Sequence, residues 1–172
     1  MITRFVNILL SIYIIFFLSH SLFAQPANTG QSIFDIQNEK EENLNIGYWA
    51  LVIAKEFDSN VDIENYLKKL DEMTEEINLM LSGRTGDMDK LLAVKTFIYE
   101  PGIWNDSLPF SYDMDDPLGE ITDHRLLSSY MDTKKGNCVS MPTLFLALME
   151  RLDPAVNFYG VKAPLHLFCR LR

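Results

Sequence analysis

The sequence has few cysteines and few basic residues, and each shortage excludes some classes of protein. Its 172 residues include only two cysteines, too few for the disulfide framework of a small secreted domain. Lysines and arginines number 15 against 24 aspartates and glutamates, a formal charge of −9 at pH 7. Nucleic acids and anionic membranes are bound through basic patches, so we expect neither as a partner. No motif indicates a nucleotide or an organic cofactor.

Charge is also nearly absent from the N-terminus, where Arg4 is the only charged residue before position 35. Residues 5–18 are almost all apolar and small residues precede Ala24, a pattern typical of a signal peptide. Residues 1–24 are therefore predicted to be a signal with cleavage after Ala24, which makes the protein periplasmic or secreted. Losing Arg4 takes the net charge from −9 to −10. The alternative is an uncleaved membrane anchor, because the uncharged stretch to Phe23 approaches spanning length.

The remaining length fits one domain whose first half is helical. Residues 25–43 are polar and are predicted to be a linker. Apolar residues at helical spacing predict a helix from Leu44 to Phe57 and a second from the N-cap Asp62 to a stop at Gly83. A third is predicted from Asp87 to Tyr99, with one buried stripe formed by Met88, Leu91, Leu92, Lys95 and Ile98.

The segment 100–123 breaks the helical pattern. It holds three prolines and seven acidic residues but no basic residue. We expect a long ordered loop beside the functional site, held in place by Phe110 and Tyr112. Its acids do not follow the spacing of a calcium-binding loop, so no metal is predicted there. A short helix at 125–131 and a polar turn at 132–136 are expected to follow.

Residues 133–172 carry the predicted chemistry. Cys138 precedes a strongly apolar helix, 139–152, and Pro142 fits only within its first turn. A helix N-terminus favours a thiolate, and its N–H groups are able to hold an oxyanion. Two strands are predicted at 156–161 and 165–171, and the second brings in His166 as a candidate general base and acid.

Other interpretations of the cysteines stay open at this point. Cys138 could be a buried structural thiol, or it could pair with Cys169 in an oxidising compartment, a disulfide contributing about 3–4 kcal/mol. Cys169 and His166 lie three apart on one strand and are expected to point to opposite faces. The disulfide and the catalytic interpretation therefore exclude each other. A zinc site that adds His124 is disfavoured by the same argument and by irregular spacing.

Both candidate residues lie in stretches that resemble a known family. The stretches Gly136-Asn137-Cys138, Leu146-Ala147-Leu148, Gly160-Val161 and Leu165-His166-Leu167 are similar to the core of the transglutaminase-like superfamily, nearest its bacterial SirB-like branch. The resemblance covers about residues 44–172. It implies an α+β, papain-like fold in which an N-terminal helical bundle precedes a nucleophile helix packed on an incomplete antiparallel sheet. For active members it implies thiol attack on a peptide or amide bond, with Cys138 as nucleophile and His166 as general base.

The chain departs from the family pattern at two points. Leu165 stands where SirB-like members often have glycine. The family's third catalytic residue, an acid or amide that orients the histidine, lies on a strand beyond Arg172. We therefore expect a domain truncated at its C-terminus, whose sheet a partner chain or self-association could complete. The alternative function is a non-catalytic binding or assembly module, or an inactive fragment, that retains the fold.

Overall fold

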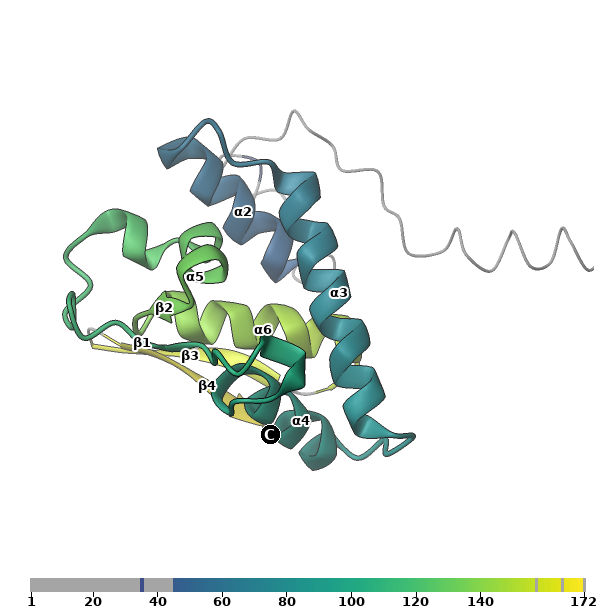
Figure 1. Ribbon diagram of the computed structural model, residues 1–172. Coiled ribbons are helices and arrows are strands. Elements are labelled where there is room, and N and C mark those ends of the chain that lie inside the picture. The colour runs from purple at the N-terminus through teal and green to yellow at the C-terminus, as the bar shows by residue number, and fades with distance from the viewer. Residues whose placement is uncertain (1–34, 36–44, 157, 165, 172) are drawn as a thin grey trace, which may run out of the picture. The chain divides into compact units, whose positions relative to one another are not determined.

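The computed structural model (Figure 1) describes Asp35 and residues 45–156, 158–164 and 166–171. All of these belong to one unit, Gln31–Arg172. The predicted signal peptide lies outside the described residues, as does the predicted linker except for Asp35. No helix in the described part of the chain is long and apolar enough to cross a membrane.

Helix α6, Ser140–Leu152, lies at the centre of the described structure (Figure 1). It contacts the four helices α2 to α5 and both strands of the hairpin β3–β4. Every residue from Leu144 to Met149 is buried. A helix that is apolar on most sides needs neighbours on all of them, and the strongly apolar sequence of α6 is accounted for by these contacts.

The three helices that precede the loop 100–123 match their predicted spans. Helix α2 is Ile46–Phe57, α3 is Ile63–Leu81 and α4 is Asp87–Tyr99. The Asp62 side chain caps α3 by accepting from the Asn65 N–H at 3.2 Å, as its position predicts.

The predicted buried stripe of α4 was wrong in part. Met88 and Leu92 are 57% and 49% exposed, whereas the buried residues of this helix are Ala93, Val94, Phe97 and Ile98. Helix α4 is apolar on more than one side, so spacing alone does not select the face that meets α3 and α6.

The loop after α4 is ordered by a small parallel bridge. Strand β1, Ser111–Tyr112, pairs with β2, Lys135–Gly136, in place of the polar turn expected there. Two short 3-10 helices, η3 (Ile103–Asn105) and η4 (Thr122–Arg125), and helix α5 (Leu127–Thr133) complete this region.

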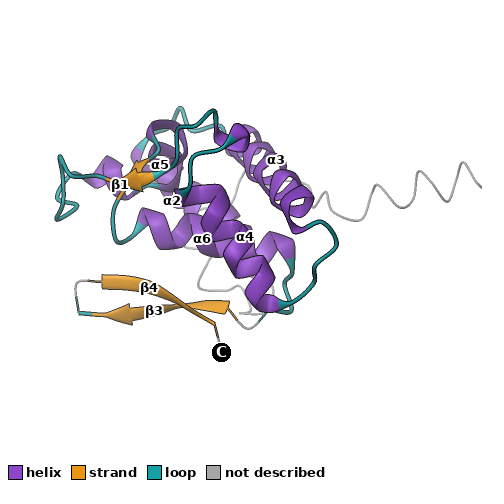
Figure 2. Cartoon of the chain, turned by 60° about the horizontal axis from the view of Figure 1, so that its bottom comes forward, coloured by secondary structure: helices purple, strands orange, loops and turns teal. Residues whose placement is uncertain are grey.

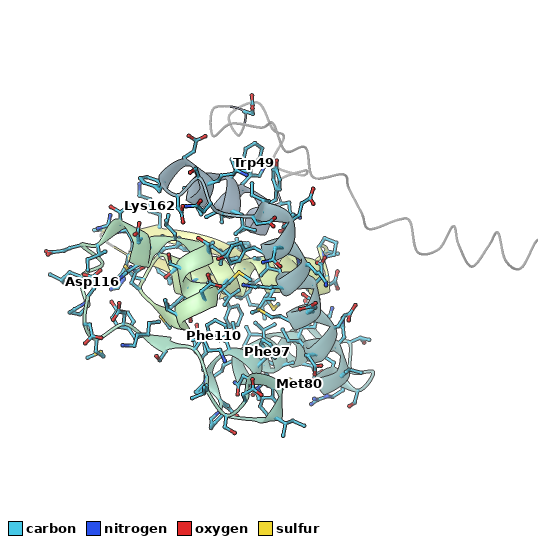
Figure 3. The ribbon with its side chains drawn as sticks, turned by 45° about the horizontal axis from the view of Figure 1, so that its top comes forward. Trp49, Met80, Phe97, Phe110, Asp116 and Lys162 are labelled. Carbon is cyan, nitrogen blue, oxygen red and sulfur yellow. The ribbon has the colours of Figure 1, made fainter. Side chains whose placement is uncertain are left out.

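Phe110 holds this loop against the body of the protein. Its ring is buried and meets the ring of Tyr130 edge-on, with centroids 5.1 Å apart. Phe97 from α4 belongs to the same core (Figure 3). Tyr112, also expected to hold the loop, is 36% exposed and instead bonds within the loop, donating to Pro117 O at 2.7 Å.

The two predicted C-terminal strands form an antiparallel hairpin. Strand β3, Phe158–Ala163, pairs with β4, His166–Leu171, so β3 runs further than predicted and its last residue pairs with the first of β4. One face packs on α6, where the rings of Phe145 and Phe158 lie 5.3 Å apart. No other described element lies against the opposite face (Figure 2). The structure is thus of mixed helix and strand, consistent with the α+β class.

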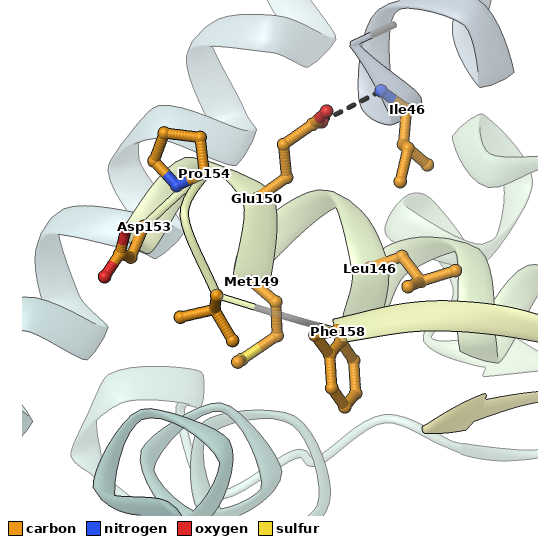
Figure 4. Close-up of a pocket in the computed structure, with 8 residues that line it drawn as sticks. Ile46, Leu146, Met149, Glu150, Asp153, Pro154 and Phe158 are labelled. Carbon is orange, nitrogen blue, oxygen red and sulfur yellow. Dashed lines mark hydrogen bonds between the residues drawn. The ribbon is translucent and has the colours of Figure 1, made fainter. Parts of the chain in front are cut away.

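A small cavity of about 110 Å³ lies between the end of α6 and the start of α2 (Figure 4). Glu150 at its wall accepts a hydrogen bond from the N–H of Ile46 at 2.9 Å. Burial raises the pKa of Glu150, although this bond and the nearby Arg151 oppose the shift. The bond satisfies an N–H group at the first turn of α2 that has no partner within the helix.

Truncating the centre of α6 tests how far the fold depends on it. Leu148 is fully buried, so Leu148→Ala is expected to lower the free energy of unfolding by about 2–5 kcal/mol. Leu79→Ala is the control because Leu79 is 71% exposed, and we expect a change within about 0.5 kcal/mol. Urea denaturation followed by circular dichroism measures both, and equal losses would contradict the central role of α6.

Candidate functional site

Cys138 lies in the turn that opens α6. Pro142 is the third residue of the helix, in its first turn as predicted. The N–H of Met141 donates to Asn137 O at 3.1 Å, so helical hydrogen bonding begins one turn before Met141. Cys138 therefore follows the residue at which that bonding starts, and its side chain is half-buried.

Asn137 caps this helix start with its side chain. Its Oδ1 accepts from the N–H of Val139 at 3.0 Å and from that of Ser140 at 3.3 Å. These two N–H groups were among those expected to hold an oxyanion. Because they already donate to Asn137, the expectation does not hold for them.

The capping residues are anchored in turn to η4. Asn137 Nδ2 and Ser140 Oγ both donate to the backbone oxygen of His124, each at 3.1 Å. Asn137 and Ser140 are 1% and 0% exposed, so both bonds are shielded from water. The position of the Cys138 turn thus depends on a residue from another element.

His124 is held by acids of the loop 100–123. Its Nδ1 lies 2.8 Å from Asp113 Oδ2 and 3.4 Å from Asp116 Oδ2, without the alignment of a hydrogen bond. Asp116 (Figure 3) also accepts from the N–H groups of Glu120 at 2.8 Å and Ile121 at 3.0 Å. Both aspartates are buried. The loop is thus anchored by inward-facing carboxylates as well as by Phe110.

Gly136 is required because the backbone passes very close to the Tyr130 ring just before the Cys138 turn. A Cβ at this position would lie 2.5 Å from the Tyr130 ring and 2.8 Å from Ser140 Oγ. Real side chains do not approach so closely, and the buried ring has little room to move. Glycine therefore lets the chain pass over Tyr130 into the Cys138 turn.

Cys138 and His166 line the same cavity, which has a volume of about 750 Å³. The walls come from α4, the first turns of α6 and the hairpin. His166 is the first residue of β4 and is exposed. Both predicted site residues thus line one cavity, although His166 belongs to the exposed face of β4 and not to the face that packs on α6. Most of the other lining residues are apolar, among them Leu91, Met141, Pro142, Phe145, Phe158 and Leu167.

Cys169 lines this cavity as well, from the opposite face of β4. Exposure alternates along the strand, so Cys169 is half-buried while His166 is exposed, and the predicted opposition of the two is confirmed. The Cys169 thiol donates to Pro142 O at 3.6 Å, and burial raises its pKa to about 11. Within the described residues the two thiols are not joined by a disulfide.

Several residues of the site are not apparent in the sequence. Asp113 and Asp116 belong to an acidic run without the spacing of a calcium-binding loop, and the sequence suggests for His124 only a disfavoured zinc site. In the described part of the chain, no group of three or more His, Cys, Asp or Glu side chains is arranged to hold a metal ion. Asn137, three residues before Ser140, was the one local sign of this arrangement, since asparagine is a favoured N-cap.

Comparison with protein-family models, with curated proteins and with solved structures finds no match to this chain.

Removing the cap tests whether Asn137 organises the Cys138 turn. Asn137→Ala leaves two helix N–H groups and the His124 carbonyl with fewer partners, and should cost about 1–3 kcal/mol of unfolding free energy. Asn78→Ala, at an exposed position on α3, should change it by less than about 0.5 kcal/mol. Urea denaturation compares the two, and a loss confined to Asn78→Ala would refute the cap.

The carboxylate of Asp116 predicts a dependence of stability on pH. Burial works to raise its pKa, but the N–H groups of Glu120 and Ile121, with His124 and Arg125, together hold it below the usual 3.8. Its stabilising contribution is therefore complete well above pH 3.8 and is lost as pH falls through the lower folded-state pKa. Asp116→Asn should flatten the fall in stability in this acidic range, measured by thermal melts. Glu76→Gln on the exposed face of α3 serves as control.

Proposed function

We propose that this protein is an exported, transglutaminase-like thiol enzyme that acts on a peptide or amide bond. The observation that carries the proposal is that Cys138 and His166 line one cavity of about 750 Å³. A thiol at the start of a buried helix and an imidazole on a neighbouring strand are the two groups that thiol acyl transfer needs. The signal-like N-terminus supports export.

The proposed reaction begins with Cys138. His166 takes the thiol proton, the thiolate attacks the carbonyl carbon, and a carbon–sulfur bond forms as the amide carbon–nitrogen bond breaks. The imidazolium returns the proton to the departing amine. Water or a second amine then attacks the thioester, which releases the acyl group and restores the thiol.

The immediate surroundings of Cys138 support this role. Its turn lies at the N-terminus of a 13-residue helix, the positive end of the helix dipole. The cap formed by Asn137 and its attachment to His124 hold this turn in one position. Cys169 is the less suitable nucleophile, because burial raises its pKa to about 11 and keeps it protonated near neutrality.

The family assignment is part of the proposal and is supported by resemblance and by element order. The stretches around Cys138 and His166 resemble the SirB-like branch of the transglutaminase-like superfamily. Helices α2 to α5 precede α6 and the hairpin follows it, which agrees with the order that the resemblance implies.

One observation favours a second function, a binding or assembly module. The β3–β4 sheet has two strands, so in the described structure each strand has one edge without a partner strand. Phe168 on the face away from α6 is 47% exposed. Paired edges and covered apolar side chains are the usual state of a stable sheet. A partner chain, or a second copy, that added a strand here would satisfy both.

Alkylation of the two cysteines tests the enzymatic proposal. At pH 6.5 iodoacetamide should modify Cys138 well before Cys169, as peptide mass spectrometry can resolve. His166→Ala should slow the modification of Cys138 by about tenfold, since the imidazole no longer assists thiolate formation. Arg170→Ala, also exposed on β4, is the matched control and should leave the rate nearly unchanged.

Equal reactivity of the two cysteines, or the same rate in wild type and His166→Ala, would refute the enzymatic role. Sedimentation velocity then tests the assembly module. That function predicts a self-associated species that Phe168→Asp dissociates, whereas a monomer at all concentrations counts against self-association.

A further inference from the structure

The cavity that holds Cys138 and His166 is large enough for more than one side chain. It is open to solvent, and its volume of about 750 Å³ falls in the range of small-molecule sites, ~300–1,000 Å³. Apolar side chains of α4, α6 and the hairpin form most of the wall. Such a wall favours an apolar ligand, because burying its surface removes both from water.

The charge of the cavity is opposite to that of the chain. None of the described residues that line it carries a carboxylate, although the chain has 24 acidic residues against 15 lysines and arginines. Lys95 is the one lysine or arginine among these lining residues. An acidic protein that keeps its acids away from one apolar cavity provides a local site for a negative ligand group.

Lys95 is positioned to meet such a group. It lies on α4 between Leu91 and Tyr99, four residues from each, so the three share one helix face and all line the cavity. Its side chain is exposed, and it forms no ion pair with the carboxylates of the described chain. A lysine stem lying along an apolar wall with its ammonium group in water is a common arrangement at such a rim.

His166 is assigned to the chemistry, and three other polar groups of the wall already have partners within the protein. The Tyr112 hydroxyl donates to Pro117 O at 2.7 Å, and the Cys169 thiol donates to Pro142 O at 3.6 Å. The Asn137 side chain caps α6 and bonds to His124. Lys95 is therefore the group best placed to add charge recognition to the apolar wall.

We propose that the cavity binds a peptide segment that combines large apolar side chains with an acidic side chain, the latter paired with Lys95. This inference rests on the proposed function and specifies its substrate: the amide that Cys138 attacks belongs to an acidic, apolar peptide. The apolar side chains occupy the space between Phe145 and the hairpin, and the carboxylate stays at the rim beside α4.

Binding of two matched peptides to the full chain tests the proposal. Acetyl-Glu-Leu-Phe-amide and acetyl-Gln-Leu-Phe-amide differ only in charge, and calorimetry measures their affinities for a Cys138→Ala protein that cannot attack them. The Glu peptide should bind about two- to fivefold more tightly, the size expected of an exposed ion pair. Adding Lys95→Met should abolish that difference. Lys55→Met on α2, which does not line the cavity, should preserve it.

The apolar part of the proposal has its own variants. Leu167→Ala should weaken both peptides alike, because Leu167 lines the cavity from the half-buried face of β4. Leu79→Ala removes an exposed apolar side chain elsewhere and should weaken neither. Circular dichroism confirms that each variant is folded.

Three results would overturn the inference: no binding of either peptide, equal affinities for the two, or a preference that survives Lys95→Met. Tight binding of decanoate with none of the peptides would also overturn it, by indicating a lipid ligand. Because the binding protein lacks the thiol, these outcomes are independent of the alkylation test. Failed binding with a reactive Cys138 removes the substrate class, whereas retained binding with an unreactive Cys138 removes the enzyme.

Discussion

The burial of α6 is the constraint on which the rest of this structure depends. Its residues from Leu144 to Met149 are all buried, so helices and a hairpin must surround it. Ser140 in the first turn is fully buried, so its N–H group cannot rely on water for a partner. Asn137 meets this need with its carboxamide oxygen, which accepts from the N–H groups of Val139 and Ser140. The burial of α6 therefore explains both the surrounding core and the Asn137 cap.

This cap also connects α6 to the acidic loop 100–123. Asn137 and Ser140 bond to the backbone of His124, and the His124 ring lies against Asp113 and Asp116. The two aspartates therefore hold η4 in place, and η4 is the element to which the Cys138 turn is bonded. Charge on the loop and geometry at the thiol are coupled through one histidine.

Local periodicity was enough to predict most of the regular elements but not these contacts. The spans of α2, α3 and α4 follow from apolar spacing and caps such as Asp62, and Pro142 indicated where α6 begins. The inward turn of Asp113 depends on where the chain brings His124, and no local pattern records that. The buried face of α4 was predicted incorrectly for a related reason. Apolar residues lie on several sides of this helix, so Met88 and Leu92 are exposed while Leu91 and Lys95 line a cavity.

The hairpin makes the two proposed functions compete for one surface. Along β4 the side chains alternate, so Cys169 faces α6 whereas His166 and Phe168 belong to the other, exposed set. An enzyme needs this side open, because substrate has to reach the cavity that His166 and Phe168 line. An assembly module needs it covered, because the exposed Phe168 and the strand edges are its reason to associate. A partner that covers this face therefore also covers His166, the proposed general base, and association would act as an inhibitor of the proposed reaction.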